Sequence, residues 1–536
     1  MAALAMLTAS LATWILGDQL ATPRSEYTFL WSFTEQIPGE FGLLSDSLSI
    51  VAAWIVCVIT AIANCYSIGY VKKNLAVFLL AMNALAMNTV LLAASANLLQ
   101  MHIFWTVLTL LSYFLLTFNP RGSPVKSSTG IVSAHAFGDL GFTIAIIALF
   151  QIFGNFNFGE KFFIGNDLQL RRLEFVALAI LTSIFFKSAQ LGSTRWLCQT
   201  PEASMPAQSL IHSATLLTAG IFPLIRLQNV FECSELVQNT MILGGLGSMT
   251  LYSIKAVFAE ELSEILAYSS IAQVGALVVA GGFSAYGAMI IMYVSHAFSK
   301  SALIFSMGSV VYSLSGEQKL SNMGGLFELL PKTYISSILT VISMVGVPLM
   351  SFYYSRKVLL NEIASANRGL ALNCIAVGLV VVAAILTSAY LFRMIYLIFH
   401  GKRKLTETSL AYLNENDNFI IFPQYIAVFF AIFSGVFFYY ALYVDLIWTD
   451  VFAFSYGAVG GYAIFTFVTV NLIGIAVAAL ICKAITPRNI SIQLNYKGID
   501  KFKKHFIHIV QNLDRKYFRK VYLLIAGSGR SNHAGR

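Results

Sequence analysis

The chain has 536 residues, of which 57% are hydrophobic and only 11% are charged, and its formal net charge is +9. Soluble domains contain about 25% charged residues, so this composition excludes a soluble protein and predicts an all-α, polytopic membrane protein. Most apolar runs exceed the ~18 residues that a helix needs to cross the hydrocarbon core. The six cysteines are scattered without a Cys-x-x-Cys pair, which disfavours a metal site or a disulfide framework.

Fourteen apolar runs predict the membrane-spanning helices. The apolar start lacks a basic region before it, so we expect a retained span and not a signal peptide. The sixth and eleventh spans are expected to be interrupted, near Gly192 and at Pro348, because glycine and proline break helices. In chain order the spans are 3–17, 47–71, 74–96, 99–118, 131–153, 173–197, 206–227, 238–258, 264–282, 286–313, 331–363, 370–399, 422–446 and 459–484.

Basic residues in the short loops predict the orientation. Lysines and arginines gather in the loops at 72–73, 121–126 and 402–404, which follow the second, fourth and twelfth spans. If each interrupted helix crosses the membrane once, these loops all lie on one side. The positive-inside rule assigns that side to the cytoplasm or the mitochondrial matrix, and both termini are then expected there.

The order of the spans predicts an internal repeat. Spans three to seven (74–227) and eight to twelve (238–399) each carry an interrupted helix in fourth place. Matching broken helices indicate two inverted five-helix repeats of a transporter, with chance and a proline kink as the alternative. The expected divisions are N-terminal helices at 1–71, the repeats at 74–227 and 238–399, C-terminal helices at 422–484 and a tail at 485–536.

The tail has an amphipathic pattern. Between 499 and 525, apolar residues recur every three or four positions opposite lysines and arginines. This spacing predicts a basic amphipathic helix that lies in the membrane interface or along a neighbouring subunit, and a solvated charged helix is the alternative. Positive charge in the tail and the inside loops indicates contact with anionic lipids such as cardiolipin, and not with nucleic acid.

Ionisable residues inside apolar spans are costly and therefore predict an ion or proton path. Lys187 immediately precedes the first break, and His212 follows it. His296 and Lys300 lie four residues apart in the tenth span, so they share one helix face. The alternative for a single histidine such as His212 is a hydrogen-bonded packing residue.

Three further charged residues complete the predicted path. Arg356 and Lys357 follow the second break, where the alternative is an interfacial anchor whose long side chain reaches the headgroups. Asp139, in the fifth span, is a buried carboxylate that needs a cation. We predict that it lies within direct or one-water hydrogen-bonding reach of Lys187.

Several motifs in the chain are specific in combination. They lie at 187–190, 209–220, 266–275 and 295–303, with support from 44–49, 65–70, 323–326 and 390–396 with 400–402. These motifs resemble the antiporter-like subunits of respiratory complex I, most closely the large distal subunit, chain 5 of the mitochondrial enzyme. The similarity covers roughly residues 1–405 in collinear order, and the tail resembles the start of that subunit's lateral helix.

The resemblance implies a proton-translocating membrane-arm subunit of NADH:ubiquinone oxidoreductase, in the mitochondrial inner membrane or a bacterial plasma membrane. It implies neighbours similar to chains 4 and 2, contacted through the C-terminal helix. The chain shows no cysteine frame and no glycine-rich nucleotide loop, so we expect no cofactor in it. NADH, FMN, iron–sulfur clusters and ubiquinone would belong to partner subunits.

The chain departs from the family at three charged positions. Thr106 stands where the family has a glutamate, Ser263 where it has a lysine, and Arg356 where a lysine is expected after the second break. We expect Asp139 to replace the missing glutamate. These departures leave two alternatives open: a subunit of a related cation/proton antiporter or inorganic-carbon uptake complex, and a structural scaffold that seals the membrane without pumping.

Overall fold

The computed structural model describes residues 25–30, 40–118, 129–154, 158, 167–198, 203–404, 414–443 and 462–485. Its helices belong to one compact unit that ends at Cys482, and a second unit begins at Lys483. Within the described residues, nine helices are long and apolar enough to cross a membrane. This confirms a polytopic helical membrane protein. The predicted first span (3–17) and the predicted tail helix lie outside the described residues.

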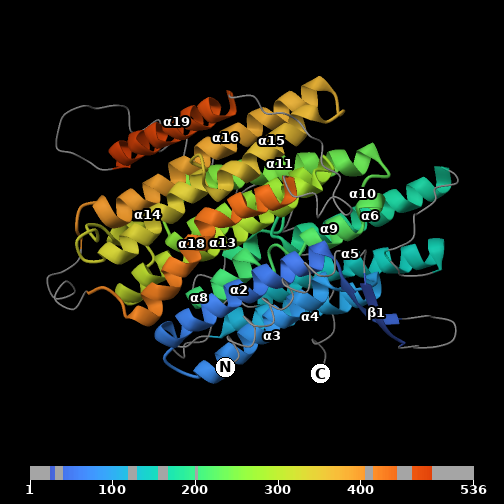
Figure 1. The fold of residues 1–536 in the computed structure, drawn as a ribbon, viewed down its shortest axis with the longest axis horizontal. Coiled ribbons are helices and arrows are strands. Elements are labelled where there is room, and N and C mark those ends of the chain that lie inside the picture. The colour runs from blue at the N-terminus through green and yellow to red at the C-terminus, as the bar shows by residue number, and fades with distance from the viewer. Residues whose placement is uncertain are drawn as a thin grey trace, which may run out of the picture. The chain divides into compact units, whose positions relative to one another are not determined.

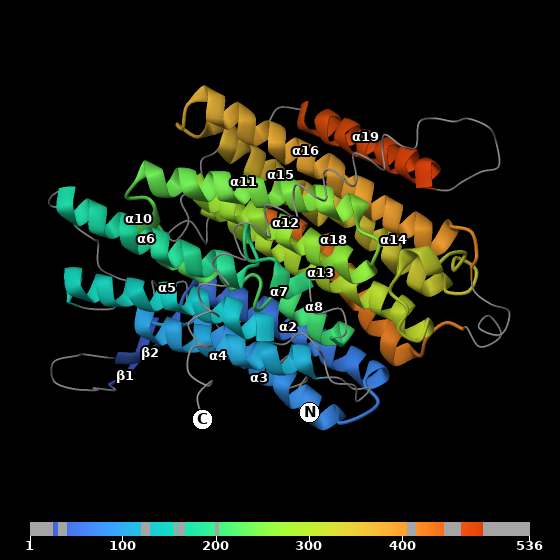
Figure 2. The same cartoon turned by 180° about the vertical axis from the view of Figure 1, so that it is seen from behind.

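The long helices lie side by side in a bundle (Figures 1 and 2). Their bounds agree with the predicted spans to within a few residues. Short helices and the 3₁₀ turn η1 (Leu320–Asn322) join the long helices, and the π-helical segment η2 (Tyr396–His400) continues α16. The helices are α2 (Ser47–Tyr70), α3 (Leu75–Ala93), α4 (Leu98–Thr117), α5 (Thr129–Phe153), α6 (Asp167–Lys187), α7 (Arg195–Cys198), α8 (Met205–Ser213), α9 (Ile221–Arg226), α10 (Gln228–Phe231), α11 (Glu235–Phe258), α12 (Leu262–Gly282), α13 (Tyr286–Ser313), α14 (Pro331–Val345), α15 (Ser351–Ser365), α16 (Leu370–Ile395), α18 (Asn418–Tyr443) and α19 (Tyr462–Ile485).

The structure confirms both predicted helix breaks. After α6 the chain turns through Ala189 and Gly192, both at positive φ, before α7 begins. The second break lies between α14 and α15, where Gly346 ends α14 in the left-handed conformation at φ 84°. Glycine adopts this conformation without a steric penalty, and Pro348 beyond it cannot continue the helix.

The seventh predicted span, 206–227, is not one continuous helix. Instead, α8 ends at Ser213 and α9 begins at Ile221. Side chains bind the backbone at this point: the Thr215 hydroxyl donates to the Leu210 carbonyl at 2.9 Å, and the Tyr293 hydroxyl donates to that of Ala214 at 3.2 Å. Leu210 keeps its helical bond from the Ala214 amide, but the Ala214 carbonyl, which a continuous helix would have used, is taken by Tyr293. The prediction of an unbroken span was therefore wrong.

A short β-hairpin was not predicted. Strands β1 (Ser25–Leu30) and β2 (Glu40–Ser45) pair antiparallel, with Ser25 opposite Ser45, in the segment between the first two predicted spans. Leu43 also bridges to Ser95, which ties β2 to the turn between α3 and α4. Among the described residues the chain is therefore helical, with one small two-stranded sheet that precedes α2.

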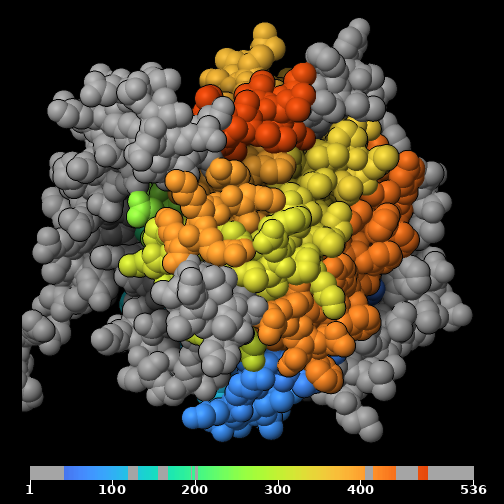
Figure 3. All heavy atoms as spheres, turned by 90° about the vertical axis from the view of Figure 1, so that its left-hand side faces the viewer, coloured from blue at the N-terminus to red at the C-terminus, as the bar shows by residue number. Residues whose placement is uncertain are grey.

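Helix α13 lies at the centre of the bundle, and its apolar segment is entirely buried. It packs against α2, α8, α12, α14, α15 and α18. Helix α18 brings the C-terminal part of the chain back against α2, where Trp54, Phe298 and Phe430 form an aromatic cluster with ring centroids 5.0–5.9 Å apart. An end-on view shows the yellow segment around α14 against the orange α18, near the blue N-terminal helices (Figure 3).

A buried ion pair fixes several helix ends. Asp46 caps α2 through the Ser49 amide, and both its oxygens accept from Arg226 at the end of α9. Arg226 also donates to the Ala93 carbonyl at the end of α3, at 2.9 Å. Burial alone would raise the pKa of Asp46, but the charge and hydrogen bonds of Arg226 outweigh this and hold the pKa below its usual value.

Candidate proton-transfer site

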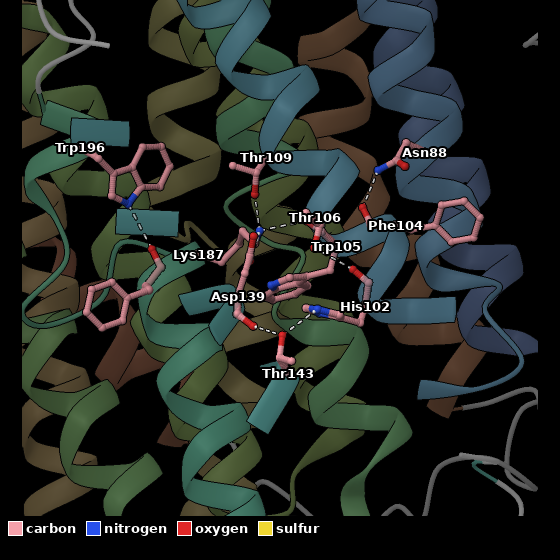
Figure 4. A network of polar contacts seen from close by, with 11 residues as sticks. Asn88, His102, Phe104, Trp105, Thr106, Thr109, Asp139, Thr143, Lys187 and Trp196 are labelled. Carbon is pink, nitrogen blue, oxygen red and sulfur yellow. Dashed lines mark hydrogen bonds and ion pairs between the residues drawn. The ribbon is translucent and has the colours of Figure 1, made fainter. Parts of the chain in front are cut away.

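Lys187 forms the centre of the first polar cluster. It is the last residue of α6, and its side chain is 1% exposed. Its Nζ donates to Asp139 Oδ1 at 2.9 Å, to the Trp105 carbonyl at 2.9 Å and to Thr109 Oγ1 at 2.5 Å (Figure 4). The predicted contact between Lys187 and Asp139 is confirmed. An ammonium has three N–H donors, so these acceptors from α4 and α5 satisfy all of them.

Among the described residues, Thr106, where the resemblance implies a glutamate, is not a hydrogen-bond partner of Lys187. The Thr106 hydroxyl instead donates to the His102 carbonyl, one turn back on α4, at 3.1 Å. Thr109, on the next turn, supplies the hydroxyl that accepts from Lys187. The Trp105 ring lies 4.8 Å from Nζ, close enough for a cation–π interaction. The sequence analysis missed the role of Thr109, because the rotation of α4 about its axis is set by packing.

Two histidines near the ion pair were also missed. The His102 ring, on α4, bonds Thr143 Oγ1 at 3.1 Å, and Thr143 also donates to the Asp139 carbonyl at 2.9 Å. His135 lies one turn before Asp139 on α5, is fully buried and meets Trp196 edge-on at 4.5 Å between centroids. Neither ring nitrogen of His135 has a hydrogen-bond partner among the described residues. In the sequence, His102 and His135 are marked only by being histidines within apolar spans.

A second cluster surrounds α12 and contains three predicted site residues. His212 Nδ1 lies 3.1 Å from Ser270 Oγ, and that hydroxyl already donates to the Leu266 carbonyl, so Nδ1 carries the proton. The Lys300 amine donates to Ser269 Oγ. No described carboxylate forms an ion pair with Lys300. The structure therefore brings His212 and Lys300 to adjacent residues of α12, with hydroxyls as partners.

His296 connects α8, α12 and α13. Its Nε2 lies 3.1 Å from the His212 carbonyl, and its Nδ1 lies 2.6 Å from the side-chain amide of Gln273. A carbonyl only accepts, so Nε2 carries a proton. An amide can present either its oxygen or its NH₂ group, so Gln273 can bind Nδ1 whether or not that nitrogen is protonated. This arrangement lets His296 change its charge without losing hydrogen bonds.

Arg356 and Lys357 are not joined to these clusters by hydrogen bonds. Arg356 reaches back across the second break and donates to the Val345 carbonyl and to that of Met344, the latter at 3.0 Å. It is 8% exposed, so it is not an interfacial anchor. Lys357 points to another face of α15, where its Nζ lies 3.4 Å from the Tyr439 hydroxyl. Arg356 thus satisfies carbonyls at the C-terminal end of α14.

Residues 95–387 match the family described as NADH:quinone oxidoreductase/Mrp antiporter, transmembrane. NADH-ubiquinone oxidoreductase chain 5 of Chondrus crispus is 29% identical over 413 residues, which cover 74% of this chain and 62% of the relative. The same chain of Metridium senile is 30% identical over 410 residues, which cover 76% of this chain and 67% of the relative. This chain thus spans about three fifths to two thirds of the length of these relatives.

Two solved structures share the fold. A chain of the Mrp complex from Dietzia sp. is similar with a TM-score of 0.75 and 22% identity, covering 99% of this chain and 61% of the other. The archaeal membrane-bound sulfane sulfur reductase contains a chain similar with a TM-score of 0.69 and 16% identity, covering 89% and 93%. At these identities the likeness concerns the fold. With the family match over residues 95–387, the chain belongs to the NADH:quinone oxidoreductase/Mrp antiporter transmembrane family.

Proposed function

We propose that this chain is a proton-translocating membrane-arm subunit of NADH:ubiquinone oxidoreductase in the mitochondrial inner membrane. The observation that carries the proposal is the buried Lys187–Asp139 ion pair at the end of a broken helix. A buried, fully hydrogen-bonded ion pair of this kind is expensive to maintain and typical of proton relays. The relatives named NADH-ubiquinone oxidoreductase chain 5 support the assignment to this oxidoreductase.

Buried polar atoms connect the two clusters in this proposal. They lie on α6, on the turn after it and on α8, and they have no hydrogen-bond partner among the described residues. Such groups usually bind water, and chains of water and hydroxyls conduct protons. The proposed path from Lys187 to His212 and on to His296 and Lys300 passes along these atoms, which are Ser183 Oγ, Ser188 Oγ, Gln190 Oε1, Ser209 Oγ and His212 Nε2.

The redox chemistry belongs to other chains in this proposal. NADH, FMN, iron–sulfur clusters and ubiquinone would be bound by partner subunits, and this chain would respond through changes in its buried charges. Its immediate neighbours would be antiporter-like subunits similar to chains 4 and 2. We propose that the basic tail contacts them, together with anionic lipids.

Replacement of Lys187 by alanine tests the proposal. In the assembled complex in sealed vesicles, Lys187→Ala should lower the number of protons moved per NADH oxidised, because it removes the titratable centre of the first half. Lys332→Ala is the matched control, since Lys332 is exposed at the start of α14. The content of assembled complex should be equal in both variants. An equal proton ratio in the two variants would show that this half does not conduct.

A subunit of a cation/proton antiporter is the second candidate, because the similar chain of the Mrp complex covers 99% of this chain. The chains that co-purify with this protein separate the two proposals. Co-purifying flavin and iron–sulfur subunits would identify the oxidoreductase. If only antiporter subunits co-purify, the oxidoreductase proposal is overturned. The ion pair at Lys187 weighs against a non-conducting scaffold, which needs no buried charge.

A further inference from the structure

His102 lies beside the Lys187–Asp139 pair but on the other side of the aspartate. The carboxylate of Asp139 faces Lys187, while its backbone carbonyl meets Thr143, which also contacts the His102 ring (Figure 4). His102 and Thr106 are four residues apart on α4 and therefore share a helix face. A titratable side chain thus stands one turn from the position where the family's carboxylate is missing.

The hydrogen bonds assign the proton on the His102 ring. The Thr143 hydroxyl donates to the Asp139 carbonyl at 2.9 Å, so its oxygen is left to accept from His102 Nε2. Nε2 therefore carries the proton and Nδ1 has the lone pair. His102 Nδ1 is buried and has no hydrogen-bond partner among the described residues. The ring thus offers a free proton acceptor next to the ion pair.

The basic side chains around Asp139 outnumber the carboxylates. Lys187 comes from α6 and His102 from α4, and both interact with Asp139, the one carboxylate of this cluster among the described residues. His135, from α5, is a third base that interacts with Lys187. A poorly polarisable interior disfavours two positive charges beside one negative charge. Protonation of one base therefore opposes protonation of the others, and the bases titrate as a coupled group.

We propose that Asp139 is the shared counter-ion of two bases, Lys187 and His102, and that His102 serves as the second titrating group of this half. The proton that leaves Lys187 Nζ is accepted by the Asp139 carboxylate and passed through a bridging water to His102 Nδ1, because a buried nitrogen without a partner usually binds water. Lysine becomes neutral, imidazole becomes imidazolium, and Asp139 returns to its carboxylate form, so the total charge is unchanged. This inference rests on the proposed function and assigns a residue to it.

A neutral isostere at 102 separates this role from simple packing against Phe142, whose ring centroid lies 5.1 Å away. Glutamine can hydrogen-bond Thr143 but cannot titrate. In the assembled complex in sealed vesicles, His102→Gln should lower the protons moved per NADH as far as Lys187→Ala does. The double variant should fall no further, because both residues act in one relay. His400→Gln, at an exposed ring that bonds the Tyr334 hydroxyl at 3.1 Å, is the matched control.

The outcomes distinguish the inference from the proposed function. Two quantities are compared with the His400→Gln control: the protons moved per NADH, and the dependence of this ratio on pH between about 5 and 8, where histidine titrates. If both are unchanged in His102→Gln, His102 is a packing residue and the inference is overturned. If Lys187→Ala also keeps the control ratio, the proposed function itself fails. Should His102→Gln not assemble, Thr143→Val is expected to lower the ratio and Thr143→Ser to preserve it. A normal ratio with valine would also overturn the inference.

Discussion

Lys187 is stable at membrane depth because the chain surrounds it with oxygen atoms. Asp139 supplies the charge, and the Trp105 carbonyl and Thr109 hydroxyl supply the remaining acceptors. The sequence was sufficient to predict the pairing, since Asp139 was the available carboxylate in the neighbouring spans. It was not sufficient to predict Thr109 or His102, because helical periodicity defines the faces of α4 but not which face meets α5.

The pairing makes a quantitative prediction for Asp139. Asp139→Ala should lower the free energy of unfolding by about 3–5 kcal/mol, because an uncompensated buried charge remains at Lys187. The Asp139→Ala/Lys187→Ala double variant should lose less than the sum of the two single variants. Thermal unfolding of the purified complex, followed by the loss of this chain from it, measures both effects. Additive losses would show that the two side chains do not interact.

At the scale of helices, some breaks could be predicted from the sequence and one could not. Gly192 and Pro348 marked two of them, because these residues act through their own backbone. The break after Ser213 carries neither residue, and Gly220 comes only at its end. It is held open by Tyr293 and His296 of α13, which bond the carbonyls of α8 and its turn. Such a break depends on a distant helix and cannot be read from local residues.

The role of Arg356 at the second helix break, between α14 and α15, can be tested by substitution. Its guanidinium satisfies two carbonyls of α14, whereas lysine would reach one. An unsatisfied buried carbonyl costs about 1–3 kcal/mol, so Arg356→Lys should lower the unfolding temperature of the complex. The protons moved per NADH should be retained in the complex that assembles, because the role of Arg356 is structural. A lowered proton ratio at normal stability would instead place Arg356 in the path.

At the scale of the whole molecule, composition predicted the class of protein, and the motif resemblance indicated the family. The residues after α19 lie outside the described structure, so the predicted role of the tail rests on its amphipathic pattern. Deletion of residues 499–536 should give complexes that lack this subunit or its neighbour, which the subunit content of the purified complex measures. The charge reversals Lys503→Glu, Lys504→Glu and Lys516→Glu should weaken lipid contact by about 1 kcal/mol per charge. Normal assembly of the truncated chain would show that the tail is a solvated appendix.

The enclosure of α13 also bears on how the chain is made. The ribosome completes α2 and α13 well before α18, yet Trp54, Phe298 and Phe430 come from these three helices and meet in one aromatic cluster. Until residues 418–443 leave the ribosome, the side of α13 that α18 covers is unpacked, including Ser299, whose hydroxyl donates to the Ala431 carbonyl of α18 at 3.5 Å. An unpaired hydroxyl is costly in hydrocarbon, so this side of α13 reaches its final packing only after α18 has been made.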